Sequence, residues 1–81
     1  MNRDAVLEQL QHVFDDIFLE DVIVTPELTA RDMQEWDSIR HISLILSVEK
    51  AFNIRFRVGE VEATRSVGEL ADLIARHTNH P

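Results

Sequence analysis

The residues Trp36, Asp37, Ser38 and Ile39 form the segment of this chain that is best suited to chemistry. They stand where a stretch without helical period gives way to a strong helical pattern. Asp37 can accept a hydrogen bond from a backbone N–H group at the start of that helix and so act as its N-cap. The positive end of a helix favours anions, so a serine displayed there is well placed to carry a phosphate. Ser38 is therefore a candidate attachment site.

Histidine gives little support for a metal centre or for catalysis. The four histidines are His12, His41, His77 and His80, and no two stand at good ligand spacing inside a predicted helix. Ser38 and His41 could share a helix face as a minimal hydrolase pair. A hydrolase also needs an orienting carboxylate and an oxyanion site, for which a chain of 81 residues has little room. We therefore expect neither a metal site nor an enzyme.

Length and composition indicate one small domain. The 81 residues are 44% hydrophobic, which is enough for one compact core. The chain has no cysteine, which excludes disulfides and thiolate metal sites and favours a reducing compartment. It shows neither a signal peptide nor an apolar run of about 18 residues that could span a membrane. We expect a monomer in the cytoplasm.

The net charge of −7 is unevenly distributed along the chain. Residues 1–37 contain ten acidic and two basic side chains, whereas residues 38–81 contain five acidic and six basic ones. Direct binding of nucleic acid requires a basic surface and is not expected. Basic protein partners are favoured electrostatically, although the acidity could equally serve only to keep the protein in solution.

Hydrophobic periodicity predicts an all-α fold, a four-helix bundle with three main helices and one short helix. Thr25-Pro26 forces extended backbone and interrupts any helix in the long first loop. Ser66 and Glu69 form a capping box before the last helix. The single domain, residues 1–81, is expected to contain helix 1 at 3–19, a loop at 20–37, helix 2 at 38–52, an extended connector at 54–58, a short helix 3 at 59–64 and helix 4 at 67–77.

The second predicted helix has an apolar and a polar face. On a helical wheel its buried side comprises Ile42, Leu44, Ile45, Val48 and Phe52, and its polar stripe comprises Arg40, Ser43, Ser47 and Lys50. Ile39 and Leu46 lie at the border, where they are either the rim of the core or contact points for a partner. Trp36 is expected to pack the first loop against the bundle.

Together these features resemble the acyl and peptidyl carrier protein family, whose members carry an Asp-Ser-Leu-like motif at the start of the second helix. The residues that carry the resemblance are Asp37-Ser38-Ile39, followed by Ile42, Leu44-Ile45, Val48-Glu49 and Phe52. The resemblance extends over nearly the whole chain. It includes the first amphipathic helix, the long loop with Thr25-Pro26 and the capped last helix.

The resemblance implies a phosphopantetheine-binding carrier and not an enzyme. Ser38 would carry 4′-phosphopantetheine from coenzyme A through a phosphodiester, and Asp37 would cap the helix and present the serine. The thiol of this arm would hold acyl or aminoacyl groups as thioesters. The implied partners are a phosphopantetheinyl transferase, a loading ligase or transferase, and downstream biosynthetic enzymes. The expected partner contacts are Glu35, Ile39, Arg40, Leu46 and Glu49.

The second helix departs from the strongly acidic docking helix of typical fatty-acid carriers. Arg40, His41 and Ser43 stand where acidic or neutral residues are frequent in that family, and Lys50 follows Glu49. We therefore expect a specialised, free-standing carrier of polyketide, nonribosomal peptide or other acyl transfer, and not one of housekeeping fatty-acid biosynthesis. An alternative hypothesis is a small helical protein-interaction adaptor in which Ser38 is unmodified. It explains the fold and the acidity but not the long loop that leads to that serine.

Overall fold

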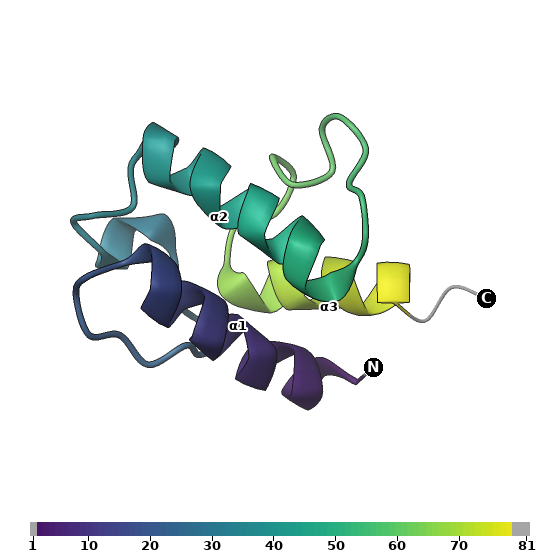
Figure 1. Ribbon diagram of the computed structural model, residues 1–81, viewed down its shortest axis with the longest axis horizontal. Helices are drawn as coiled ribbons and strands as arrows, with labels where there is room; N and C mark the ends of the chain where they lie inside the picture. Colours follow the sequence, from purple (N-terminus) through teal and green to yellow (C-terminus); the bar gives the residue numbers. More distant parts are fainter. Residues whose placement is uncertain (1, 79–81) are drawn as a thin grey trace.

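The computed structural model describes residues 2–78, which form three α-helices and one short 3-10 helix, with no strand among them. In chain order these are α1 (Arg3–Ile17), η1 (Ala30–Asp32), α2 (Ser38–Phe52) and α3 (Val67–Thr78), and the predicted all-α class is confirmed. Figure 1 shows α1 beside both α2 and α3, and α1 contacts each of them. No helix in residues 2–78 is long and apolar enough to cross a membrane. Of the four histidines, His80 lies outside the described residues.

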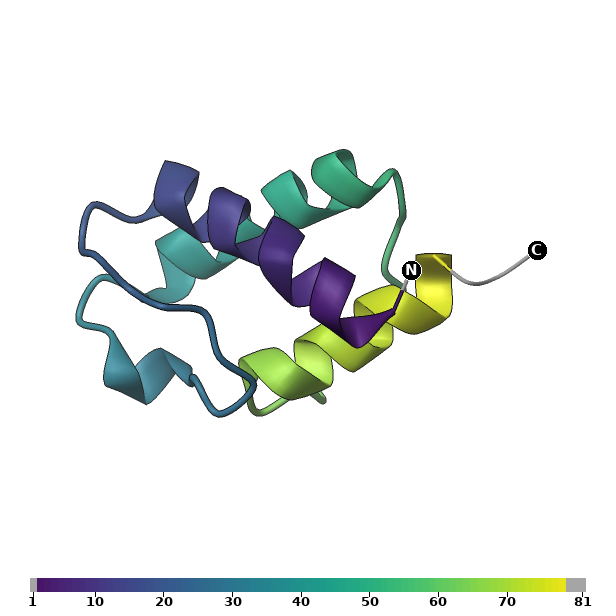
Figure 2. The same ribbon diagram turned by 90° about the horizontal axis from the view of Figure 1, so that it is seen from below.

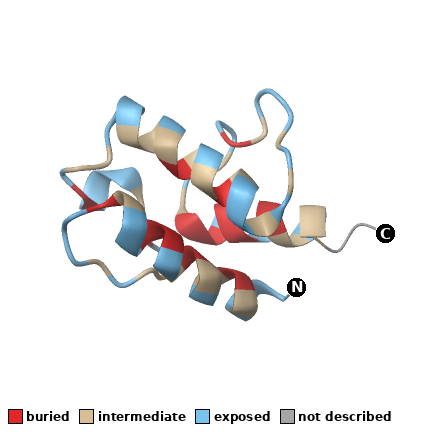
Figure 3. Cartoon of the chain, in the orientation of Figure 1, coloured by how far each residue is buried: buried red, intermediate tan, exposed pale blue. Residues whose placement is uncertain are grey.

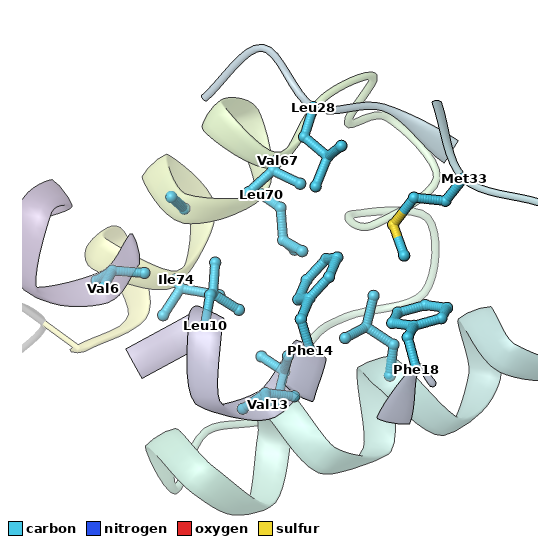
Figure 4. Packing of buried hydrophobic residues seen from close by; sticks show 13 residues of the cluster. Val6, Leu10, Val13, Phe14, Phe18, Leu28, Met33, Val67, Leu70 and Ile74 are labelled. Atoms are coloured by element: carbon cyan, nitrogen blue, oxygen red, sulfur yellow. The ribbon is translucent and has the colours of Figure 1, made fainter. Parts of the chain in front are cut away.

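The core lies where α1 meets the other two helices and the long loop. Figure 4 shows Phe14 among side chains from several elements, and Phe14 and Leu10 are fully buried. Figure 3 shows the buried positions facing the centre of the molecule along all three α-helices. The buried cluster comprises Val6, Leu10, Val13, Phe14, Phe18, Leu28, Met33, Leu44, Val48, Val67, Leu70, Ala71 and Ile74.

Helix α1 begins at a side-chain cap and ends two residues earlier than predicted. Asn2 Oδ1 accepts a hydrogen bond from the Ala5 N–H at 2.8 Å, which supplies the N-cap. At the other end the backbone of Phe18 is extended, with φ −108° and ψ 140°. This turn keeps the Phe18 ring in the core while Leu19 points to solvent, and the chain therefore leaves the helix after Ile17.

The long first loop is attached to both α1 and α3. The side-chain amide of Gln11 donates to the Val22 carbonyl and accepts from the Val24 N–H, each at 2.8 Å. At the start of α3, the Gly68 N–H donates to the Pro26 carbonyl at 2.9 Å. A Cβ on Gly68 would lie 2.9 Å from that oxygen, so the close approach requires glycine. Figure 2 shows the loop crossing from the end of α1 to the start of α3.

The loop also contains η1, which hydrophobic periodicity does not predict. Its cap pairs Thr29 with Asp32, whose carboxylate accepts from the Thr29 N–H at 2.9 Å. Thr-x-x-Asp is a capping signature, and it is the feature of the sequence that could have indicated a helical turn here. A 3-10 helix of three residues is too short to produce a hydrophobic period.

The segment between α2 and α3 contains turns and no helix. Asn53 caps α2 in the left-handed conformation, with φ 55°, as asparagine at this position commonly does. The extended connector after it is present as predicted, but the short helix expected at 59–64 is replaced by hydrogen-bonded turns. Gly59 has φ +89°, which lies outside the α-helical region, so a helix cannot continue through it. Val61 nevertheless anchors the segment, since only 6% of its surface is exposed.

The assignment of Ile42 to the buried face of α2 was wrong. Leu44 and Val48 are fully buried, but Ile42 is 61% exposed. With 3.6 residues per turn, Ile42 lies about 160° around the helix from Leu44. It therefore belongs with Ile39 and Leu46 on the solvent side of α2.

Candidate functional site

Ser38 is the first residue of α2, and its side chain is exposed. Asp37 is the N-cap, and its Oδ1 atom accepts a hydrogen bond from the Arg40 N–H at 2.9 Å. The N–H groups of Ser38 and Ile39 have no intrahelical acceptor, because they belong to the first turn. The first turn of α2 contains no acidic residue. These features leave the serine hydroxyl open to an enzyme, beside backbone donors that favour a phosphate.

The segment that leads to Ser38 is fixed by an aromatic cluster. The Trp36 ring meets Phe14 edge-on, with centroids 5.4 Å apart, and its centroid lies 5.9 Å from that of Phe18. The Trp36 Nε1–H donates to His41 Nδ1 at 3.1 Å, and the two rings stack. The expected role of Trp36, packing the loop against the bundle, is confirmed. His41 Nδ1 is occupied by this bond, so that nitrogen is not available to take a proton from Ser38.

Three hydrogen bonds join the end of α1 to the turn that carries Ser38. Arg40 Nη1 donates to the Ile17 carbonyl at 2.7 Å, which satisfies a free carbonyl at the end of α1. The Glu20 N–H donates to the Glu35 carboxylate, and the Glu35 N–H donates back to Glu20 at 3.3 Å. The end of α1, the beginning of the long loop and the serine turn therefore form one pole of the molecule, on the left in Figure 1.

The solvent face of α2 carries an exposed apolar stripe that starts next to Ser38. Ile39 is 75% exposed, and Ile42 and Leu46 are each 61% exposed. Beside it lies a groove of about 300 Å³, which includes Ile42, Leu46 and Phe56 in its lining. Val58, which is fully exposed, also lines this groove. We call Ile39, Ile42 and Leu46 the α2 stripe.

The other expected partner contacts are engaged inside the molecule. The Arg40 guanidinium binds α1, and the Glu35 carboxylate binds the Glu20 backbone. Glu49 Oε2 accepts from the Phe56 N–H at 2.9 Å, which holds the connector against α2. Ile39 and Leu46 remain the expected contacts whose side chains are mainly exposed.

The exposure of Ile42 was not predicted from the sequence. The signal was present, because positions 39, 42 and 46 follow the i, i+3, i+7 spacing of one helix face. The difficulty was that α2 carries a second apolar set at the same spacing, which includes Leu44 and Val48. Spacing alone does not tell which of two apolar stripes faces the core.

A separate polar cluster lies away from Ser38, where α3 meets the turns after α2. His77 Nε2 lies 3.0 Å from Glu60 Oε1, and the Phe56 ring meets the imidazole edge-on. The Arg57 N–H also donates to Glu60 Oε1, at 2.6 Å. The hydrogen bond from Arg57, supported by His77, lowers the pKa of Glu60 from its ordinary 4.5. Among the described residues, no group of three histidine or carboxylate side chains could hold a metal ion.

The chain is similar in sequence to one known protein and in structure to another, and both carry the same name. A protein of Rubrobacter xylanophilus named acyl carrier protein is 31% identical over 78 residues, which span 95% of this chain and 96% of the relative. The solution NMR structure of the holo acyl carrier protein from Geobacter metallireducens superimposes with a TM-score of 0.73 and 37% identity, and it covers 93% of this chain and 83% of the other. No protein-family model matches the chain.

Proposed function

The chain belongs to the acyl carrier protein family, and from that premise we propose that Ser38 carries a 4′-phosphopantetheine arm. As a member of this family, the chain is a carrier and not an enzyme. The observation that carries the proposal is the exposed Ser38 hydroxyl at the first residue of α2, directly after the Asp37 cap. Acyl or aminoacyl groups travel on the arm as thioesters and are delivered to biosynthetic enzymes.

The residues around Ser38 fit a phosphodiester. The N–H groups of Ser38 and Ile39 are open donors at the positive end of α2. The Asp37 carboxylate is directed to the Arg40 N–H, which reduces its repulsion of a neighbouring phosphate. When attached, the arm supplies a terminal thiol for thioester chemistry. The chain contains no cysteine, so no protein thiol competes for the cargo.

The α2 stripe is the proposed contact surface for partner enzymes. Ile39 and Leu46 lie mostly in solvent, and burying them against a partner removes apolar area from water. Of the other three expected contacts, Glu49 lies on the same side of α2 as Leu46, Arg40 lies on the side toward α1, and Glu35 precedes the helix. Their side chains already bind the backbone of neighbouring segments. Substituting them would therefore change the fold of these segments as well as docking.

We further propose a specialised carrier rather than one of general fatty-acid synthesis. Helix α2 contains Arg40 and Lys50 and a single acidic residue, Glu49. Such a helix has no acidic stripe to meet a basic docking site. A holo sample offered to a malonyl transferase of fatty-acid synthesis should be loaded much more slowly than a fatty-acid carrier from the same organism. Loading at an equal rate would contradict this part of the proposal.

Intact-protein mass spectrometry tests the attachment. The purified chain is incubated with coenzyme A and a broad-specificity phosphopantetheinyl transferase. We expect the mass of one phosphopantetheine to be added to the wild type and to Ser43→Ala, a control serine later in the same helix, but not to Ser38→Ala. A folded wild-type sample that stays unmodified would instead favour the adaptor hypothesis, in which the α2 stripe binds a partner without a prosthetic group.

A further inference from the structure

Two apolar side chains outside the α2 stripe are among the most exposed in the molecule. Leu19 is 88% exposed and Ile23 is 78% exposed, both in the loop that follows α1. Their neighbours Phe18, Val22 and Val24 are buried or half-buried. Along residues 22–24 the side chains alternate between partly buried and exposed, as in a strand, whereas residues 19–21 are all exposed. Figure 3 shows this loop as a largely exposed edge of the molecule.

The loop holds these side chains in fixed positions. Gln11 binds the backbone on both sides of Ile23, at the Val22 carbonyl and the Val24 N–H. Next to Leu19, the backbone of Glu20 is bonded to Glu35. A partner that binds this loop therefore meets a preorganised surface and does not have to order a flexible chain.

The same bonds place Leu19 beside the serine turn. Leu19 lies between Ile17, whose carbonyl binds Arg40 two residues after Ser38, and Glu20, which binds Glu35 three residues before Ser38. The exposed apolar side chain is thus held at the end of the molecule where the Ser38 hydroxyl is presented. We call residues 19–23 the loop surface.

Carboxylates surround the loop surface. Asp15, Asp16, Glu20 and Asp21 are exposed, and no ion pair joins any of them to a base within residues 2–78. Arg40, which binds the Ile17 carbonyl at the start of this segment, is half-buried. An apolar pair with an acidic rim is complementary to an apolar depression ringed by lysine or arginine.

On the basis of the proposed function, we propose that the enzyme that transfers phosphopantetheine to Ser38 docks on the loop surface, with Leu19 and Ile23 in an apolar depression and basic residues facing Glu20 and Asp21. This enzyme must bring its own active site to the Ser38 hydroxyl, so it covers the pole around that serine. Enzymes that act on the far end of the arm have no such requirement. The loop surface is thus a contact of the phosphopantetheinyl transferase in addition to the α2 stripe, and the enzymes that handle the cargo do not require it.

Steady-state kinetics of arm transfer test this assignment. The variants are Leu19→Ser, Ile23→Ser and their combination, and the control is Ala63→Ser, at an exposed apolar residue of the segment after α2 that lies outside both proposed surfaces. We expect the double variant to raise KM for the carrier by about tenfold with little change in kcat, and Ala63→Ser to change KM by less than about twofold. Thermal unfolding should show all variants folded, because the altered side chains are exposed.

The effect of a rim charge on KM provides a second, independent test. Asp21→Asn should raise KM severalfold at low salt and weaken the dependence of KM on ionic strength, because it removes one charge from the rim. If the wild type receives the arm normally and KM is unchanged in both the double variant and Asp21→Asn, the docking proposal is overturned and the carrier function stands. A defect confined to enzymes that act on the loaded arm would also overturn it. A wild-type chain that never receives the phosphopantetheine arm would instead refute the proposed function itself.

Discussion

Around Ser38, the proposed attachment site, the polar side chains have internal partners. Asp37 caps α2, Arg40 binds the end of α1, and His41 accepts from Trp36. Ser38, in contrast, is exposed to solvent. The residues next to the serine thus hold the turn in place, and the serine itself remains available for modification.

The Asp37 cap should be measurable as stability. Asp37→Ala removes the acceptor for the Arg40 N–H and should lower the free energy of unfolding by about 1 kcal/mol. Asp37→Asn keeps a side-chain oxygen and should stay close to the wild type. Urea denaturation followed by circular dichroism measures both variants. Equal loss in the two variants would show that the negative charge, and not the hydrogen bond, is what stabilises the helix.

The Glu60 cluster should contribute to the acid sensitivity of the fold. Because the pKa of Glu60 is lowered from 4.5, its ionised form stabilises the folded state above that pH. This stabilisation is lost as the pH falls through the lowered value. In a series of thermal unfolding curves from neutral pH to pH 3, Glu60→Gln should therefore show a shallower loss of Tm below about pH 4.5 than the wild type.

Glu62→Gln is the control for this series, since Glu62 is exposed and lies in the same segment. Its pH profile should follow that of the wild type. If Glu60→Gln and the wild type lose stability in parallel, the hydrogen bonds to Glu60 have no energetic role in the folded state.

Among the elements, the long loop packs against the helices and contributes to the core as a helix would. Gln11 binds it along α1, Gly68 binds it at the start of α3, and Leu28 and Met33 fill part of the core. Its route determines the position of the turn that carries Ser38.

Loss of the Gln11 amide should release the loop. Gln11→Ala removes two hydrogen bonds to backbone groups and should destabilise the fold by about 1–2 kcal/mol. Hydrogen exchange at the Val24 amide should become faster, since that N–H loses its acceptor. Gln9→Ala is the matched control on the same helix. Equal exchange rates at Val24 in the wild type and Gln11→Ala would contradict this role.

Local signals predicted some elements well and others poorly. The bounds of α2 were predicted because Asp37 caps one end and the helical pattern stops at Asn53, which adopts the left-handed conformation. The short helix at 59–64 was not formed, because Gly59 takes a positive φ that a sequence pattern does not specify. The end of α1 and the exposure of Ile42 depend on which other elements pack against α1 and α2. Both are set by tertiary contacts and not by local spacing.

At the scale of the molecule, the uneven charge becomes a spatial feature. The acidic residues at the end of α1 and in the loop lie at the pole that presents Ser38. The sequence shows the imbalance between its two parts. It does not show that Glu20 and Glu35, fifteen residues apart, exchange hydrogen bonds and bring the loop beside the serine turn. Docking at this pole should therefore depend on ionic strength.

Locating the modification on the chain shows whether Ser38 is the attachment point of a carrier. After incubation with coenzyme A and a phosphopantetheinyl transferase, the chain is digested and the peptide that contains Ser38 is fragmented in the mass spectrometer. We expect one phosphopantetheine, on Ser38, in the wild type. A folded wild-type chain without the modification, or a modification located on another residue, would contradict the claim.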